Sequence, residues 1–243
     1  MERGVKYALV LVALLLTAAE VRAEDGGFGI WSELNVEKKL TNKIDLEFFG
    51  ENRSRYGHET VDRWSVGLGA SYKLTNWLKA SADYTYLYDH NEKWNDKQTK
   101  LANFWGSRHR FNVALTGSVS FGNLSVSLRE RWQYTYRPQK TVDRTKVSNG
   151  KVEERTYNGK GKNVWRNRLQ LKYKLTSMWR PYVNGETFLA GSGIDKYRLS
   201  AGTEIRVSKK HSFDVKYLFQ KSCSDDDDEG DRHVLGFGYT FKF

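Results

Sequence analysis

Hydrophobic and polar residues alternate one by one along most of the chain. In residues 63–74, for example, Trp64, Val66 and Leu68 share one parity, and Arg63 and Ser65 share the other. A period of two predicts a β-strand with one apolar and one polar face. Eleven segments show this alternation, roughly residues 28–39, 43–53, 63–74, 77–88, 107–121, 123–137, 164–175, 180–189, 196–207, 211–221 and 232–243. The pattern predicts an all-β protein.

The connections between these segments alternate in length. Tight turns at residues 40–43, 74–77, 121–124, 175–179 and 207–211 are separated by longer polar stretches at 54–62, 89–106, 138–163 and 222–231, and a shorter one at 190–195. Short turns at one end and long loops at the other are typical of outer-membrane β-barrels, whereas a β-sandwich has no reason to alternate them. We therefore expect a transmembrane antiparallel up-and-down β-barrel of ten to twelve strands.

The count of eleven conflicts with the even strand numbers of bacterial barrels. Either a further strand lies within residues 138–163, or residues 28–39 are not an ordinary wall strand. A second conflict is Glu130, which falls on the apolar parity beside Leu128 and Trp132. Because a charge facing the bilayer centre is costly, we expect a bulge at this position or a place outside the hydrocarbon.

The first 23 residues have the features of a secretory signal peptide. Arg3 and Lys6 precede an apolar run at residues 7–19, and small residues end at Ala23. The run is shorter than the ~20 residues that span a bilayer, so we expect cleavage after Ala23 and a barrel domain of residues 24–243. Export would place this barrel in the cell outer membrane, among outer-membrane lipids.

The last segment is the most aromatic one. Leu235, Phe237, Tyr239, Phe241 and Phe243 share one face, and the chain ends on Phe243. Such an ending resembles the terminal strand of bacterial outer-membrane barrels. The resemblance implies that Tyr239, Phe241 and Phe243 form the membrane-assembly signal read by the barrel assembly machinery.

Composition and net charge limit the classes of partner that this protein is expected to bind. Mean hydropathy is −0.70, which a barrel tolerates because only alternate residues meet lipid. The net charge of +11 becomes +10 when the signal peptide leaves with three basic and two acidic residues. No nucleic-acid motif accompanies this charge, so we expect no nucleic acid partner. The single cysteine, Cys223, excludes an internal disulfide.

The charges in the strands take the parity opposite to the apolar residues, which predicts a charged lumen. The lumen or constriction candidates are Arg53, Arg63, Arg108, Arg110, Arg129, Arg131, Arg166, Arg168, Glu186, Arg198, Glu204 and Arg206. Glu47, Glu51, Asp83 and Asp214 share the inward parity. Two readings stay open: an ion-pair network that fills a narrow structural barrel, or a cationic constriction that passes small anionic solutes.

Other functions find less support. A lipid-modifying enzyme would need a serine close to a base, but two residues after His109, His211 and His233 come phenylalanine, phenylalanine and leucine. We expect no catalytic residue, metal or cofactor, and we interpret the acidic residues 224–231 as a solvated loop. A surface-lipid enzyme assembled across strands and an adhesion or partner-binding barrel acting through its loops remain alternatives.

Six segments carry a resemblance to a known family: residues 29–40 (GIWSELNVEKKL), 61–74 (VDRWSVGLGASYKL), 108–110 (RHR), 129–132 (RERW), 165–168 (WRNR) and 181–186 (PYVNGE). Together they resemble an uncharacterised bacterial outer-membrane β-barrel family, the domain of unknown function with number 2490. The resemblance spans most of the chain after the signal peptide. It implies a barrel and supplies no catalytic residue.

Overall fold

The computed structural model describes residues 28–55, 60–191, 193–224 and 230–243, so the expected signal peptide lies outside the described residues. The strands are β1 (Phe28–Lys39), β2 (Ile44–Arg55), β3 (Thr60–Lys73), β4 (Leu78–Trp94), β5 (Lys100–Phe121), β6 (Leu124–Arg137), β7 (Lys140–Lys146), β8 (Val152–Tyr157), β9 (Lys160–Tyr173), β10 (Trp179–Ala190), β11 (Gly193–Arg206), β12 (His211–Ser222) and β13 (Arg232–Lys242). No helix in this part of the chain could cross a membrane.

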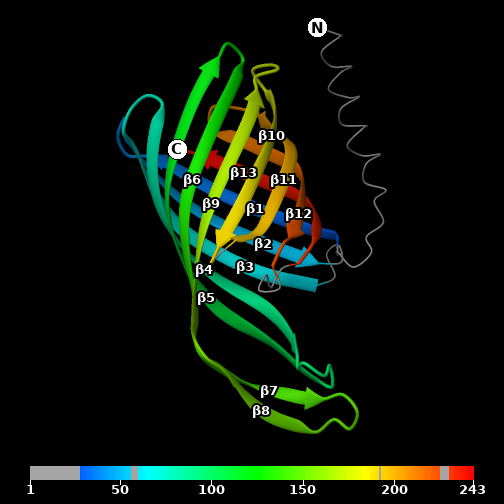
Figure 1. Ribbon diagram of the computed structural model, residues 1–243. Helices are drawn as coiled ribbons and strands as arrows, with labels where there is room; N and C mark the ends of the chain where they lie inside the picture. The colour runs from blue at the N-terminus through cyan, green and yellow to red at the C-terminus, as the bar shows by residue number, and fades with distance from the viewer. Residues whose placement is uncertain (1–27, 56–59, 192, 225–229) are drawn as a thin grey trace.

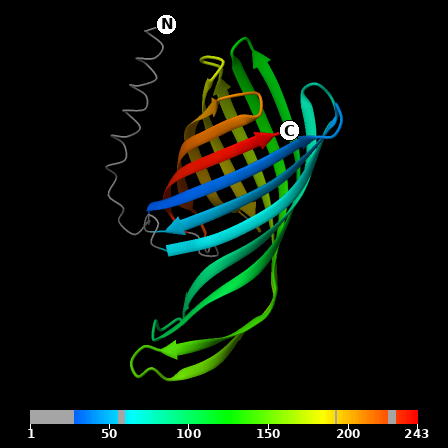
Figure 2. The same cartoon turned by 180° about the vertical axis from the view of Figure 1, so that it is seen from behind.

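Eleven of these strands form a closed ring (Figures 1 and 2). The order is β1-β2-β3-β4-β5-β6-β9-β10-β11-β12-β13, and β13 pairs with β1 to complete the barrel. Closure leaves no edge strand in the wall, so each wall strand is hydrogen-bonded on both sides. The predicted all-β barrel of ten to twelve strands is confirmed.

The closing pair explains the odd strand count. Neighbouring strands run antiparallel at ten junctions of the ring, whereas β1 and β13 run parallel from Phe28↔His233 to Glu37↔Lys242. In a ring of alternating strands, an odd number gives the first and last the same direction. The expectation of an antiparallel barrel is therefore wrong at this one seam. Residues 28–39 are a wall strand, and the barrel departs from the even strand number of most bacterial barrels by pairing this strand in parallel.

Ion pairs stabilise the parallel seam from the lumen side. The Lys216 ammonium on β12 reaches across β13 to Glu33 on β1, with Nζ 2.7 Å from Oε1. Its stem lies over Gly236, where an added Cβ would be only 2.7 Å from Lys216 Cε. A glycine at this position therefore gives the lysine its path. Lys242 bonds Glu37 near the C-terminal end of the seam, with Nζ 2.6 Å from Oε2.

The distribution of residue types is the reverse of that in a soluble protein. Among the described residues, seventeen buried ones are polar or charged and eight are apolar. Large apolar side chains instead cover the outer face: Trp64, Leu68 and Phe111 are 55%, 63% and 46% exposed. A continuous exposed apolar surface of this kind requires an apolar environment around the barrel.

Glu130 lies on the outer face in the middle of β6. The pairing of β6 with β5 and β9 continues without a register shift, so the expected bulge is absent from both junctions. The Trp165 indole donates a hydrogen bond of 2.8 Å to Glu130 Oε2. The carboxylate thus lies among the apolar side chains of the outer face, and one neighbouring donor partly replaces its lost hydration. The other expectation, a place outside the hydrocarbon, stays a prediction.

The predicted loops at residues 89–106 and 138–163 are largely β-structure. Strands β4 and β5 continue beyond the barrel rim as a ribbon, and β5 also pairs with β7, which forms a hairpin with β8 (Figure 1). Hydrogen bonds from Lys100 and Arg144 hold the pKa of Glu153 at about 2, well below its ordinary value. Both faces of these strands contact water, so their residues are polar throughout. Without an apolar face they lack the alternation that predicts a strand, and the sequence pattern therefore predicted loops.

The direction of β1 places Phe28 at the long-loop end of the barrel, on the same side as Cys223. In intact cells that display the long loops outward, we expect a membrane-impermeant maleimide to label native Cys223, and to label Phe28→Cys in a Cys223→Ser background. Thr41→Cys in the same background serves as the control in the opposite turn and should stay unlabelled. Labelling of Thr41→Cys without Phe28→Cys would contradict the assigned direction.

Replacing Glu130 should show what surrounds the outer face. In phospholipid vesicles we expect Glu130→Leu to raise the free energy of unfolding by roughly 1–2 kcal/mol, because a charge leaves the apolar band. Denaturant unfolding followed by tryptophan fluorescence measures the change. Val126→Leu, on the same face of β6, is a control for side-chain volume. A destabilised Glu130→Leu variant would mean that the carboxylate does not face hydrocarbon.

Candidate functional site: the lumen

The barrel encloses a cavity of about 720 Å³. Ten of the eleven wall strands contribute lining residues, and the exception is β13, whose inward positions include Gly236 and Gly238. Sixteen lysines and arginines and seven acidic residues line the space, an excess of nine positive charges. This excess is the largest electrostatic feature of the barrel interior.

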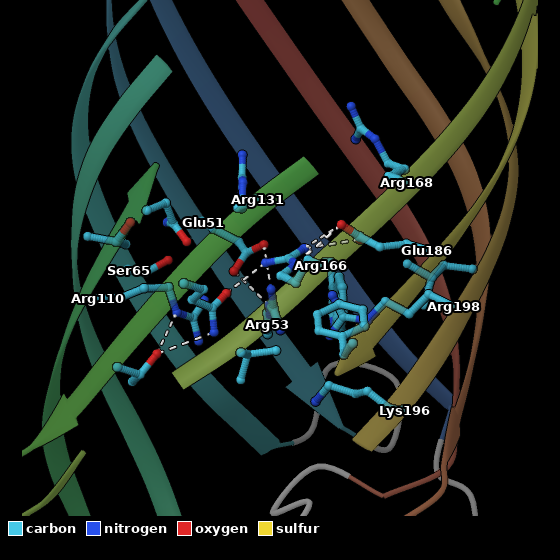
Figure 3. A pocket seen from close by; sticks show the side chains of 18 of the residues that line it. Glu51, Arg53, Ser65, Arg110, Arg131, Arg166, Arg168, Glu186, Lys196 and Arg198 are labelled. Carbon is cyan, nitrogen blue, oxygen red and sulfur yellow. Dashed lines mark hydrogen bonds and ion pairs between the residues drawn. The ribbon is translucent and has the colours of Figure 1, made fainter. Parts of the chain in front are cut away.

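Glu186 on β10 is the centre of the main ion-pair cluster (Figure 3). Its carboxylate accepts a hydrogen bond of 2.6 Å from Arg129 Nη2, and both of its oxygens lie 3.0 Å from Arg166 Nη2. Arg166 also donates to Gln133 Oε1 at 2.8 Å. Charge-assisted bonds of this kind offset the cost of removing the charges from water.

The arginines around Glu186 come from two neighbouring strands. Arg129 pairs in register with Arg168, and Arg131 pairs with Arg166, so β6 and β9 present four guanidinium groups on one patch of the wall. Like charges directly opposite each other on paired strands are destabilising. Glu186 neutralises only part of this patch, which we call the arginine patch.

Two aromatic side chains hold further arginines inside the barrel. The Arg53 guanidinium lies 3.8 Å from the centre of the Trp31 ring, and Arg198 lies 5.1 Å from the same ring. Arg166 stacks on Phe188 at 4.4 Å. Trp31 is only 3% exposed, so these cation–π contacts are shielded from solvent and orient the guanidinium groups firmly.

A second network occupies the long-loop end. Asp89 accepts a hydrogen bond from Arg63 and forms an ion pair with Arg108, whose Nε lies 2.8 Å from Oδ2. Asp62 likewise joins Arg55 to Arg232, whose Nη1 lies 2.6 Å from Asp62 Oδ2. The residues of this network border a smaller cavity of about 210 Å³. Here the basic side chains have acidic partners, in contrast to the arginine patch.

Arg131 and Arg168 are the exceptions within the arginine patch. Neither forms a hydrogen bond or an ion pair with any described residue, and Arg131 Nε is a buried donor without an acceptor. In Figure 3 both side chains point into the lumen away from the Glu186 bonds, and no dashed line ends on them. Two buried cations of this kind can accept an anion from solution.

The structure brings ten of the twelve predicted lumen residues to the main cavity. They are Arg53, Arg63, Arg108, Arg110, Arg129, Arg131, Arg166, Arg168, Glu186 and Arg198. Glu204 and Arg206 also face inward, but they lie near the tight turn that follows β11, where Glu204 accepts bonds from both Arg206 and Lys172. Tyr239 and Phe241 lie on the outer face of β13, and Phe243 follows its last residue.

Some lumen residues escaped the sequence reasoning. Trp31 and Phe188 point inward although hydrophobic residues were assigned to the outer face. Asp89, Lys93 and Arg137 lie near the ends of the predicted segments, where parity was not assigned. The parity of β1 and β10, read from their charged neighbours Glu33 and Glu186, is the signal that could have identified the two aromatics.

The histidines of the wall do not contact a serine through any bond in the described residues. His109, His211 and His233 each share a hydrogen bond with a tyrosine hydroxyl, from Tyr84 at 2.8 Å, Tyr239 at 2.7 Å and Tyr217 at 2.5 Å. These pairs join adjacent strands on the outer face. Their arrangement is that of cross-strand packing pairs.

Comparisons with known proteins agree with the barrel fold. The family described as protein of unknown function (DUF2490) matches residues 28–231. No curated protein matches the chain. Among solved structures, the chain is similar to the translocator domain of the autotransporter NalP from Neisseria meningitidis, with 11% identity and a TM-score of 0.55 over 91% of this chain and 92% of that one.

Two further structures share the fold. The β domain of the Bordetella autotransporter BrkA has 12% identity and a TM-score of 0.51, over 83% of this chain and 82% of that one. The NanC porin has 13% identity and a TM-score of 0.51, over 88% of this chain and 97% of that one. At these identities the likeness establishes the fold alone, which is that of outer-membrane β-barrels.

Removing the central carboxylate should destabilise the barrel. We expect Glu186→Gln to lower the free energy of unfolding by about 3 kcal/mol or more, because Arg129 and Arg166 lose their counter-charge while still buried. Glu204→Gln is the matched control and should cost about 1 kcal/mol or less, since its partners are partly exposed. Denaturant unfolding in detergent micelles measures both variants. Equal losses would mean that Glu186 is not the centre of the network.

Proposed function

Because the chain belongs to the DUF2490 family and has the fold of outer-membrane β-barrels, we propose that it is a bacterial outer-membrane protein that forms a narrow channel for small anionic solutes. In this proposal the signal peptide is cleaved after Ala23, and the assembly machinery reads Tyr239, Phe241 and Phe243. The apolar outer face supports the membrane location, since water would otherwise bathe it.

The charge of the lumen supports the preference for anions. Nine excess positive charges raise the local concentration of anions in a space bounded by a low-dielectric wall. Rings of basic side chains select anions in pores in the same way. The sign of the potential therefore favours anionic over cationic solutes.

The channel proposal depends on one observation: Arg131 and Arg168 face the cavity, and neither has a hydrogen-bonded counter-charge among the described residues. A barrel filled only for rigidity gains from pairing every buried charge, as Glu186 does for Arg129 and Arg166. Arg131 and Arg168 instead face the cavity without a hydrogen bond or an ion pair to any described residue. Their charges are available to a solute.

A structural barrel is the second candidate function. The paired networks around Glu186 and Asp89 favour it, because they cross-link neighbouring wall strands throughout the long-loop half of the lumen. The two candidates differ in conductance: a filled barrel passes no ions, whereas a narrow channel shows discrete openings.

Purified protein in planar bilayers tests this proposal. We expect discrete openings with anions more permeant than cations, and we expect Arg131→Gln combined with Arg168→Gln to lower the anion-to-cation permeability ratio several-fold. Arg206→Gln, outside the cavity lining, is the control and should change it little. Absence of openings would favour the structural barrel, and unchanged selectivity in the double variant would remove these arginines from the proposed conduction path.

A further inference from the structure

Resting on the proposed channel, we propose that its preferred solutes are dipolar: small molecules that carry an anionic group and a cationic ammonium group together. The basis is a set of charges of opposite sign on different strands of one cavity wall that form no ion pair with each other within the described residues. The arginine patch supplies the positive side, and carboxylates on β2, β4 and β12 supply the negative side.

The positive side consists of Arg131 on β6 and Arg168 on β9. They lie on adjacent strands, displaced along the wall, since Arg131 is paired with Arg166 and Arg168 with Arg129. Glu186 is already bonded to Arg129 and Arg166, so its hydrogen bonds go to neither of the two. A carboxylate or phosphate group of a solute can bond to both arginines, because a guanidinium presents several N–H donors in a planar fork.

The negative side begins with Glu47 on β2 and Asp83 on β4. Glu47 forms no hydrogen bond or ion pair with any described residue, and it lines the same cavity as the arginine patch. Asp83 accepts a hydrogen bond of 2.6 Å from the Asn112 amide and a weak one from Thr85. It forms no ion pair with a described residue, but the Arg131 guanidinium is close enough to attract its charge. Both carboxylates therefore face the cavity with no cation bonded to them.

The register of the wall brings these two carboxylates to one place. Glu47 pairs with Gly69, and Gly69 pairs with Asp83, so the two acidic residues flank a position without a side chain. A Cβ on Gly69 would lie 3.1 Å from Asp83 Cβ. Glycine at this position lets the Asp83 side chain pack against the backbone of β3, and no third side chain separates the two carboxylates.

A third carboxylate extends the negative side. Asp214 on β12 also lines the cavity and accepts a hydrogen bond of 2.9 Å from the Tyr182 hydroxyl. The Lys216 ammonium nearby is bonded to Glu33. Opposite charges held on separate strands produce a field across the lumen, and this field orients a solute that has a dipole of its own.

Electrostatics then distinguishes classes of solute. A simple anion satisfies Arg131 and Arg168 but gains nothing from Glu47 and Asp83, which repel it. A simple cation is attracted by Glu47 and Asp83 but repelled by the arginines, and the nine excess positive charges of the lining oppose its entry. A zwitterion is attracted at both ends, so it resides longer in the lumen than an anion of the same size.

The test uses three solutes of similar size: glycylglycine as the zwitterion, N-acetylglycine as the anion and N-acetylglycinamide as the neutral molecule. Each is added to the full-length protein conducting chloride in a planar bilayer, and the concentration that halves the current is measured. We expect glycylglycine to block at a several-fold lower concentration than N-acetylglycine, and N-acetylglycinamide to block least.

The variant Glu47→Gln with Asp83→Asn should remove the advantage of glycylglycine over N-acetylglycine while keeping anion selectivity at least as high as before. Glu204→Gln, which removes a carboxylate outside the cavity lining, should keep the advantage. Glu47→Gln alone keeps the folded wall intact, because Glu47 makes no bond, and it should remove part of the advantage.

The outcomes separate the two proposals. Equal block by glycylglycine and N-acetylglycine, or an advantage that survives in the double carboxylate variant, overturns the dipolar preference while the anion channel stands. A complete lack of chloride openings overturns the channel, and the dipolar preference with it.

Discussion

Hydrocarbon cannot hydrogen-bond to a peptide group, and this constraint shapes the whole wall. Each N–H and C=O group facing lipid must be satisfied by the next strand, so the sheet has to close on itself. The chain closes with eleven wall strands, and the parallel pairing of β1 with β13 is the consequence. Parallel ladders are slightly less stable per residue. The Lys216–Glu33 and Lys242–Glu37 ion pairs lie where that weaker junction needs support.

The same constraint turns the charges inward and concentrates them. Strand alternation places an arginine or lysine toward the lumen at many positions, and the limited space makes these cations neighbours. Carboxylates, glutamine and two aromatic rings compensate most of them, as around Glu186, Gln133 and Trp31. The carboxylates Asp62 and Asp89 each pair with two arginines at the long-loop end, whereas Glu186 alone bonds within the arginine patch. This difference between the two regions, rather than the number of arginines, is the reason for assigning the proposed solute contact to the arginine patch.

Much of the barrel could be predicted from alternation alone. All eleven wall segments and the inward direction of the twelve lumen candidates follow from parity, since a side chain in a strand has only two directions to choose from. The partners within the lumen could not be predicted, because they depend on which strands are adjacent and in which register. Arg131 and Arg166 look equivalent in sequence, yet only Arg166 reaches Glu186. The ribbon beyond the rim was missed because water on both faces removes the alternation. Parity placed Glu130 on the correct face, but its hydrogen bond to Trp165 could not be predicted because the two residues lie on different strands.

The parallel seam also orders the events of folding. Its two strands are separated by almost the entire chain, so the entropy of bringing them together exceeds that of forming any hairpin in the wall. The ten antiparallel strand pairs join segments that are near each other in sequence, whereas the β1–β13 pair joins the two ends of the barrel domain. Closure of the β1–β13 seam is therefore the pairing with the largest entropic cost in the wall, and glycine at position 236 keeps the path of the Lys216 side chain to Glu33 clear across this seam.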